Sequence, residues 1–214
     1  RRYDRIVQTG TQLRSDSDLD EITEYIRAGK LGKIQWIQGV SYKLRKPLER
    51  RPLWYPESLD YDLYCGPSPM TPLERNRLHY DWHWQWRTGN GDLVNMGIHA
   101  IDKIRRFIGD DAMPSRVMSM GGRYVVKDVT DLPNTQLTVM DFAGVPVFYE
   151  NRNLPTRPGS RSTDRFRGQR IGIIVQCEHG YYGGLEGGSI YDNDGNRILR
   201  KAVDVDTVTA HLVN

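Results

Sequence analysis

Apolar residues recur at helical spacing in two segments of the chain. Leu19, Ile22 and Ile26 predict a helix over Ser17–Ala28. A second helix is predicted to end near Gly109, with one largely apolar stripe formed by Val94, Ile98, Ile101, Arg105 and Ile108. Each helix can therefore bury one side and leave the other exposed.

Alternation of apolar and polar residues predicts strands in much of the remaining sequence. Lys33–Leu44 alternates over its whole length, which predicts a long, half-buried strand. Further strands are predicted at Arg116–Val126, Thr135–Phe142, Val145–Asn151, Ile171–Cys177, Gly188–Asp192 and Arg197–Lys201. The last two are joined through Asp194-Gly195 as a hairpin, and the short links between neighbours favour an antiparallel sheet. The elements together predict an α+β fold.

Three segments are not predicted to join this core. Residues 46–91 hold most of the prolines, which predicts short, irregular pieces. Arg152–Arg170 contains six arginines among Pro, Gly, Ser and Thr, so it is predicted to be a polar loop, either solvated or acting as a lid or inter-subunit arm. The chain opens on a strand-like Ile6-Val7 without an initiator methionine, and we therefore interpret it as a fragment.

Candidate chemistry lies on the second helix. Asn95, His99 and Asp102 are spaced i, i+4 and i+7, so their side chains project in nearly the same direction, and Arg106 extends the row by a turn. We refer to these four residues as the polar row. A histidine in the first turn lies near the positive end of the helix dipole, which favours the neutral ring that a base requires. Asp102 is predicted to hold the second ring nitrogen, and Asn95 to bind a hydroxyl or an oxyanion.

The stretch Tyr80–Arg87 alternates aromatic and polar side chains, as an extended segment does when it lines a cavity. Aromatic faces stack on sugar C–H surfaces while polar groups bind hydroxyls, so this stretch favours a carbohydrate-like ligand. For each tryptophan, filling of the core is the alternative interpretation. For His99 the alternative is a structural histidine on a packed helix.

Two other patterns are too weak to assign a site. Gly89-Asn90-Gly91 matches half of a dinucleotide-binding fingerprint, but Val94 occupies the third glycine position, so we interpret it as a flexible turn with Asp92 as helix cap. His79 and His83 are four residues apart, yet no carboxylate or thiol cluster accompanies them. We therefore predict no metal site.

Composition limits the class of protein. A chain of 214 residues supports one substantial domain, and a net charge of +3 from nearly balanced acids and bases gives no electrostatic case for nucleic acid or membrane as a partner. No run approaches the roughly 18 apolar residues of a membrane span. Cys65 and Cys177 lie far apart and are predicted to be free thiols.

The residues around the polar row resemble a known family, the glucose–fructose oxidoreductase and inositol dehydrogenase (Gfo/Idh/MocA) family. Its substrate-domain helix carries Asp-x-Gly-x-His-x-x-Asp, which Gly97, His99 and Asp102 match, whereas Asn95 replaces the commoner aspartate. Residues 7–15 resemble the last strand and following turn of the family's nucleotide-binding domain. Residues 62–69, the tryptophan-rich stretch and Pro133-Asn134-Thr135-Gln136 resemble one bacterial branch of dehydrogenases in it.

The resemblance implies a large open, mainly antiparallel sheet with helices on one face, as in the C-terminal domain of glyceraldehyde-3-phosphate dehydrogenase. It divides the chain into residues 1–15, the end of a Rossmann domain otherwise absent, and residues 16–214, a domain for substrate binding and oligomerisation. NAD or NADP would bind the full-length protein, whereas this fragment is expected to bind no cofactor and to be inactive alone. A homo-oligomer would form through the sheet.

By the same resemblance, the function is that of an NAD(P)-dependent sugar or polyol oxidoreductase with His99 as acid/base. Because asparagine exchanges no proton at neutral pH, Asn95 leaves His99 to act alone or with Asp102. The residues expected to orient the sugar are Arg14, Tyr80, Trp82, Trp84 and Arg87. The alternatives are redox-assisted glycoside cleavage and a non-catalytic binding or oligomerisation domain. A cytoplasmic location is expected, with the periplasm as alternative because an upstream segment could carry an export signal.

Overall fold

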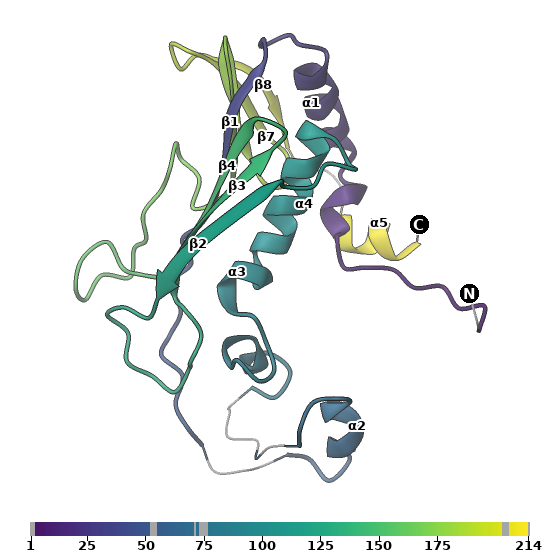
Figure 1. The fold of residues 1–214 in the computed structure, drawn as a ribbon, viewed down its shortest axis with the longest axis vertical. Coiled ribbons are helices and arrows are strands. Elements are labelled where there is room, and N and C mark those ends of the chain that lie inside the picture. The colour runs from purple at the N-terminus through teal and green to yellow at the C-terminus, as the bar shows by residue number, and fades with distance from the viewer. Residues whose placement is uncertain (1–2, 52–54, 71, 73–76, 203–205, 214) are drawn as a thin grey trace.

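The computed structural model describes residues 3–51, 55–70, 72, 77–202 and 206–213. One eight-stranded sheet forms its centre, in the order β2-β3-β4-β1-β5-β6-β7-β8 (Figure 1). The strands are β1 (Ile34–Ser41), β2 (Arg116–Gly122), β3 (Thr135–Phe142), β4 (Val145–Arg152), β5 (Ile171–Cys177), β6 (Gly180–Gly184), β7 (Gly188–Asp192) and β8 (Arg197–Lys201). β1 and β4 run parallel, and the other neighbouring strands run antiparallel.

Helices α1 (Ser17–Arg27) and α4 (Gly97–Ile108) lie on the same side of this sheet (Figure 1). The alternation of the strands points Ile37, Val147 and Ile173 toward them, and all three side chains are fully buried. From α1, Leu19 and Ile22 complete the same core. The predicted fold, an open and mainly antiparallel sheet with helices on one face, is confirmed.

The helix that carries the polar row faces the sheet differently from the prediction. Val94 and Ile98, assigned to the buried stripe, are exposed, whereas the buried residues of α4 are Gly97, Ala100, Lys103, Ile104 and Phe107. Small residues decide this orientation. A Cβ on Gly39 of β1 would lie 2.8 Å from the ring of Tyr149 and 3.7 Å from the Cβ of Ala100. The glycine therefore lets α4 approach the sheet on its Ala100 face.

The predicted second helix is divided. A short helix, α3 (Gly91–Asn95), ends before Met96, and α4 begins at Gly97. Met96 still joins the hydrogen-bond ladder, because its N–H donates to Asp92 and its carbonyl accepts from Ala100. Asn95 and His99 thus lie on consecutive helices rather than on one.

The strand predictions hold for most elements, with three corrections. β1 and β2 are shorter than predicted, and β6 is a strand that the sequence pattern did not reveal because glycine occupies three of its five positions. Ile6 and Val7 form no strand and are exposed, since no neighbouring strand among the described residues pairs with them. The division of the chain at residue 15 stays a prediction.

The proline-rich segment includes short helical pieces. They are α2 (Tyr61–Cys65) and the 3-10 helix η2 (Asp81–Trp84), so Tyr80–Arg87 is not extended as predicted. Near the N-terminus a second 3-10 helix, η1 (Gln12–Ser15), is contacted by α5 (Thr207–Val213). Asp16 then caps α1 through the N–H of Leu19.

The arginine-rich loop between β4 and β5 extends on the side of the sheet opposite α1 and α4 (Figure 1). Its end is anchored there by Arg167, whose guanidinium lies 5.3 Å from the ring centre of Trp36 and 4.4 Å from that of Tyr181. Phe166 contacts Trp36 as well. This loop is therefore fixed at one end on the helix-free face of the sheet.

Candidate active site

The polar row begins at the junction of α3 and α4. His99 occupies the first turn of α4 and is half-buried, and its Nδ1 is buried without a hydrogen-bond partner among the described residues. Burial lowers the pKa of His99 below its usual 6.5, although the nearby charges of Asp102 and Glu186 oppose this shift. The ring is therefore neutral at pH 7, and its buried Nδ1 makes no hydrogen bond with the described residues.

Asp102 does not hold His99 as predicted. Both of its carboxylate oxygens accept from Nε of Arg14 at 2.9 Å, and Nη2 of the same guanidinium lies 2.7 Å from Oδ1. Arg14 also reaches Asp110 at 3.1 Å. A planar guanidinium binds a carboxylate in this two-point geometry more strongly than an imidazole does, so Arg14 and Asp102 fix η1 to α4. Arg106, the last residue of the row, pairs with Asp20 of α1.

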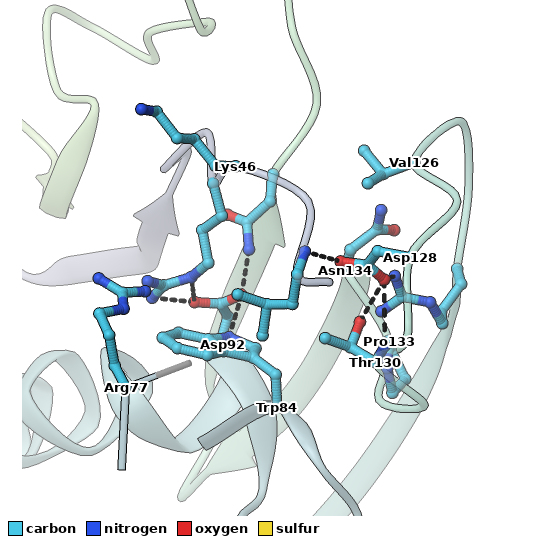
Figure 2. Close-up of a pocket in the computed structure, with 13 residues that line it drawn as sticks. Lys46, Arg77, Trp84, Asp92, Val126, Asp128, Thr130, Pro133 and Asn134 are labelled. Carbon is cyan, nitrogen blue, oxygen red and sulfur yellow. Dashed lines mark hydrogen bonds and ion pairs between the residues drawn. The ribbon is translucent and has the colours of Figure 1, made fainter. Parts of the chain in front are cut away.

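Asp92 is the centre of a buried polar cluster beside the row. It accepts hydrogen bonds from Arg45, from the indole N–H of Trp84 and from the amide of Asn153, while only 1% of its surface is exposed (Figure 2). The predicted cap role is thus wrong, because these three partners occupy its carboxylate. Arg45 also lies flat over Trp84, 3.8 Å from the ring centre.

Arg45 connects this cluster to the polar row. Its Nη2 donates to Oδ1 of Asn95 at 3.2 Å, and its Nη1 to the hydroxyl of Tyr80 at 3.4 Å. The bond to the guanidinium orients the Asn95 amide, whose nitrogen has no acceptor among the described residues. Asn95 is thereby able to donate to a ligand hydroxyl one turn before His99.

The aromatic residues predicted to form one sugar-binding wall contact one another through His83 but line two different cavities. Trp84 is buried under Arg45, whereas Trp82 stacks on His83 with ring centres 3.8 Å apart. Trp82 lines a different cavity, of about 260 Å³, with residues of α2. Tyr80 contacts Arg45, and Arg87 is exposed after η2. The structure thus brings Tyr80 and Trp84 together with Asn95, and leaves Trp82 and Arg87 apart from them.

Three buried polar side chains lie on the helix-facing side of the parallel pair, β1 and β4. Ser41 pairs in register with Asn151, and Tyr149 lies next to Gly97 of α4. Both amide atoms of Asn151 lack hydrogen-bond partners among the described residues, whereas a hydrogen bond between Ser41 and Tyr149 opposes the rise that burial causes in the pKa of Tyr149. A buried polar group left unpaired costs about 1–3 kcal/mol. Asn151 therefore calls for a partner, such as a ligand or a water molecule, that the described residues do not supply.

Arg45, Asp92 and Asn153 were missed as site residues, but the sequence contains a signal for two of them. On the helix-facing positions of β1 and β4, apolar residues give way to polar ones toward the carboxyl end. Counting every second residue from Ile37 leads to Arg45, and counting every second residue from Val147 leads to Asn153. The parallel register brings both ends together. No local pattern indicates that Asp92 joins them, since that contact depends on where α3 packs.

The glycine turn before α3 is not open as a phosphate cradle would be. Gly91, which begins α3, adopts φ +67 and packs against Leu132, so the glycine turn contacts protein where a phosphate cradle would need open space. No group of three or more potential metal ligands occurs in the described part of the chain. Within the same residues, no helix combines the length and apolar character needed to cross a bilayer. Both cysteines are free.

Comparison with protein families gives one match. The model of the Gfo/Idh/MocA oxidoreductase family, C-terminal alpha/beta domain, matches residues 28–143, which include β1 and both helices of the polar row. Among curated proteins, none matches the chain.

Solved structures of low sequence identity share the fold. Aldose-aldose oxidoreductase from Caulobacter crescentus, complexed with glycerol, is 10% identical with a TM-score of 0.63, over 99% of this chain and 53% of that one. An inositol dehydrogenase homolog complexed with NAD+ from Azotobacter vinelandii is 12% identical with a TM-score of 0.60, over 95% and 46%. A super-repressor mutant of Gal80p from Saccharomyces cerevisiae is 16% identical with a TM-score of 0.59, over 99% and 50%. The chain thus spans about half of each of these structures.

Proposed function

Because the chain belongs to the Gfo/Idh/MocA oxidoreductase family and contains its C-terminal α/β domain, we propose that it is the substrate half of an NAD(P)-dependent sugar or polyol oxidoreductase. The observation that carries this proposal is His99, a half-buried histidine whose pKa is lowered by burial and whose Nδ1 has no partner among the described residues. Asn95, held by Arg45, offers an amide donor beside it.

These residues suit the oxidation of a secondary alcohol. Asn95 donates to a substrate hydroxyl and fixes the carbon that bears it. The neutral imidazole of His99 takes the hydroxyl proton as the carbonyl forms, and the imidazolium returns it in the opposite direction. Since Asp102 is bound by Arg14, His99 performs the transfer without a carboxylate on its second nitrogen.

The hydride from the same carbon needs an acceptor outside the described residues. A nicotinamide dinucleotide supplies that acceptor, and we place its binding site in a preceding nucleotide-binding domain, as the resemblance of residues 7–15 suggests. The NAD+ complex of the inositol dehydrogenase homolog supports the proposed cofactor. The glycerol complex of the aldose-aldose oxidoreductase supports a polyol or sugar as the substrate.

A cofactor assay tests the function. Addition of sugars or polyols to the full-length protein with NAD or NADP is expected to change the nicotinamide absorbance in proportion to product. Release of free sugar from a glycoside without net change in absorbance would instead establish redox-assisted cleavage, the second enzymatic candidate. If neither change occurs with any sugar, the proposal of a catalytic domain is wrong.

Two observations favour a binding domain as the further candidate. The fold is shared with Gal80p, whose structure is named as a super-repressor mutant rather than as an enzyme. In addition, Asn95 stands at the motif position where the family more often has aspartate, and asparagine cannot exchange a proton. A sugar that binds next to His99 without reduction of any nicotinamide would support this candidate.

The helix-free face of the sheet is proposed to bind a second copy of the chain. At its β2–β3 end Met118, Met120 and Leu137 are exposed side by side in the strand register. Burial of such an apolar patch favours association. Met120→Lys is therefore expected to shift the full-length protein toward smaller species in sedimentation velocity. Lys33→Gln, an exposed lysine just before β1 and away from this patch, is the control. An unchanged distribution of sedimentation coefficients for Met120→Lys would exclude this interface.

A further inference from the structure

A small cavity beside the polar row is lined by more cations than carboxylates. Arg45, Lys46, Arg77 and Arg123 line it together with Asp92 and Asp128. Lys46 lies at its rim, with the ammonium directed outward (Figure 2). The cavity lies between the end of β1, the start of α3 and the β2–β3 loop. Each of the three arginines is paired with an aspartate, Asp92, Asp128 or Asp81, so Lys46 carries the positive charge in excess.

Both carboxylates are already occupied by protein donors. Asp92 accepts from Arg45, Trp84 and Asn153, as described above. Asp128 accepts from Arg123, from the hydroxyl of Thr130 at 2.7 Å and from the N–H of Leu48 at 3.1 Å. Neither carboxylate therefore needs a ligand cation, and each is committed to holding an arginine in place.

Spare donors remain on the cationic side. Lys46 is exposed and has no partner among the described residues. Arg77 pairs with the buried Asp81 through Nε at 2.9 Å and Nη2 at 2.6 Å, which leaves its third nitrogen without a partner in that part of the chain. The positive field extends to Tyr80. Burial alone would raise the pKa of Tyr80, but the hydrogen bond from Arg45 and the charges of Arg45, Lys43 and Arg77 outweigh it and lower that pKa.

The size of the cavity suits a small group. Its volume is about 60 Å³, several times the roughly 10–15 Å³ that one water molecule needs on the same measure. It therefore admits a group larger than water, such as the carboxylate or phosphate substituent of a sugar ring. The ring would remain outside, where Arg45 contacts Asn95 and the polar row continues to His99.

We infer that the substrate is a sugar with an anionic substituent, a carboxylate or a phosphate, which this cavity binds through Lys46, Arg77 and Arg45 while the reacting hydroxyl lies at His99. The inference rests on the proposed function, because it assigns the class of the sugar at that site. Guanidinium and ammonium donors bind such anions through charge-assisted hydrogen bonds.

Matched ligands and variants of the full-length protein test it. Glucuronate and glucose differ in the carboxylate, and glucose 6-phosphate carries the alternative anion. Glucuronate or glucose 6-phosphate is expected to have at least about tenfold higher kcat/KM than glucose. Calorimetric affinity for the preferred anion should fall as salt increases, because charge pairs are screened. Which anion binds more tightly identifies the substituent.

Lys46→Gln is the informative variant, since Lys46 has no contact that folding depends on. It is expected to weaken binding of the anionic sugar about five- to tenfold and to leave glucose unaffected, while Lys33→Gln, a lysine at the far end of β1, changes neither. Equal use of neutral and anionic sugars, insensitive to Lys46→Gln, would overturn the inference and leave the proposed function intact. Lys46-dependent binding of glucuronate without any nicotinamide reduction would support the anion site and overturn the oxidoreductase function.

Discussion

Replacement of His99 by alanine is expected to lower kcat/KM of the full-length protein about 10²- to 10⁴-fold, the usual contribution of a general acid or base. The reason is local: the Nδ1 of His99 has no partner among the described residues, whereas the Asp102 carboxylate is bound by Arg14 and the Arg106 guanidinium pairs with Asp20. The measurement is the initial rate of nicotinamide reduction at saturating cofactor.

The pH profile gives a second readout that a structural role for His99 would not change. Because burial lowers the pKa of His99 below 6.5, kcat/KM for alcohol oxidation should rise with pH through an apparent pKa below 6.5, and His99→Ala should lose this limb. His179→Ala, at the exposed β5–β6 turn, is the matched control. A rate within a few-fold of wild type for His99→Ala would show that another group moves the proton.

Asp102→Asn separates two roles of the carboxylate. If Asp102 only anchors Arg14, its replacement should weaken the contact between η1 and α4 while the acid limb of the profile stays in place. A shift of that limb toward lower pH would mean that the Asp102 charge acts on His99, since it opposes the effect of burial.

The sheet could be predicted from the sequence because alternation reports burial directly. Thr135–Phe142 and Ile171–Cys177 were predicted with the bounds observed. Successive side chains of a strand point to opposite faces of the sheet, so the pattern of burial can be read from neighbouring residues alone. β6 escaped because its glycines carry no side chain to alternate.

The orientation of α4 could not be read from its own sequence. A helical wheel favours the stripe with Ile98, yet the glycine at 39 and the small Ala100 allow a closer approach on another face. The exposed stripe then lines an open cavity of about 710 Å³ with Thr9, Arg14 and Val117. Packing between distant segments, rather than periodicity, decides which side of this helix is buried.

The contacts of the candidate site were the least predictable part. His99 and Asn95 were found because helical spacing groups them, whereas the partner of each depends on long-range packing. Arg14 is 88 residues from Asp102, and Arg45 is 50 from Asn95. The geometry of the aromatic run was predicted wrongly, because η2 turns Trp82 and Trp84 toward different cavities, and its role in binding sugar stays a prediction.

Lys103 leads to the second prediction with a large effect, an increase of stability with pH. Its side chain is fully buried, with Nζ donating to the hydroxyl of Tyr182 at 2.7 Å and to the carbonyl of Leu185. Burial lowers the pKa of Lys103 from 10.5 to about 7, against the opposing charges of Asp16 and Glu186. Above pH 7 the amine is therefore neutral in the folded protein and still protonated in the unfolded chain.

The sign follows from proton binding. Between pH 7 and 10.5 the unfolded state binds more protons than the folded state, so the free energy of unfolding rises with pH, by at most about 1.4 kcal/mol per pH unit. Burial raises the pKa of Cys177 to about 11, so its loss of stability begins only near pH 9. The lowered pKa of Tyr80 contributes a rise of the same sign, which the Lys103 variant below separates from that of Lys103. The expected gain from Lys103 between pH 7 and 9 is up to about 3 kcal/mol.

Denaturant unfolding at pH 7, 8 and 9 measures this slope. Lys103→Met keeps the apolar stem but cannot titrate, so its stability should rise much less over the same range, whereas Lys33→Gln, an exposed control, should retain the slope of the wild type. A flat wild-type curve, or an equal slope in Lys103→Met, would mean that Lys103 stays charged when buried. In that case the Tyr182 hydroxyl and the Leu185 carbonyl would have to compensate the full positive charge of the buried ammonium. Hydrogen bonds of that strength would hold the β6–β7 loop against α4 at any pH.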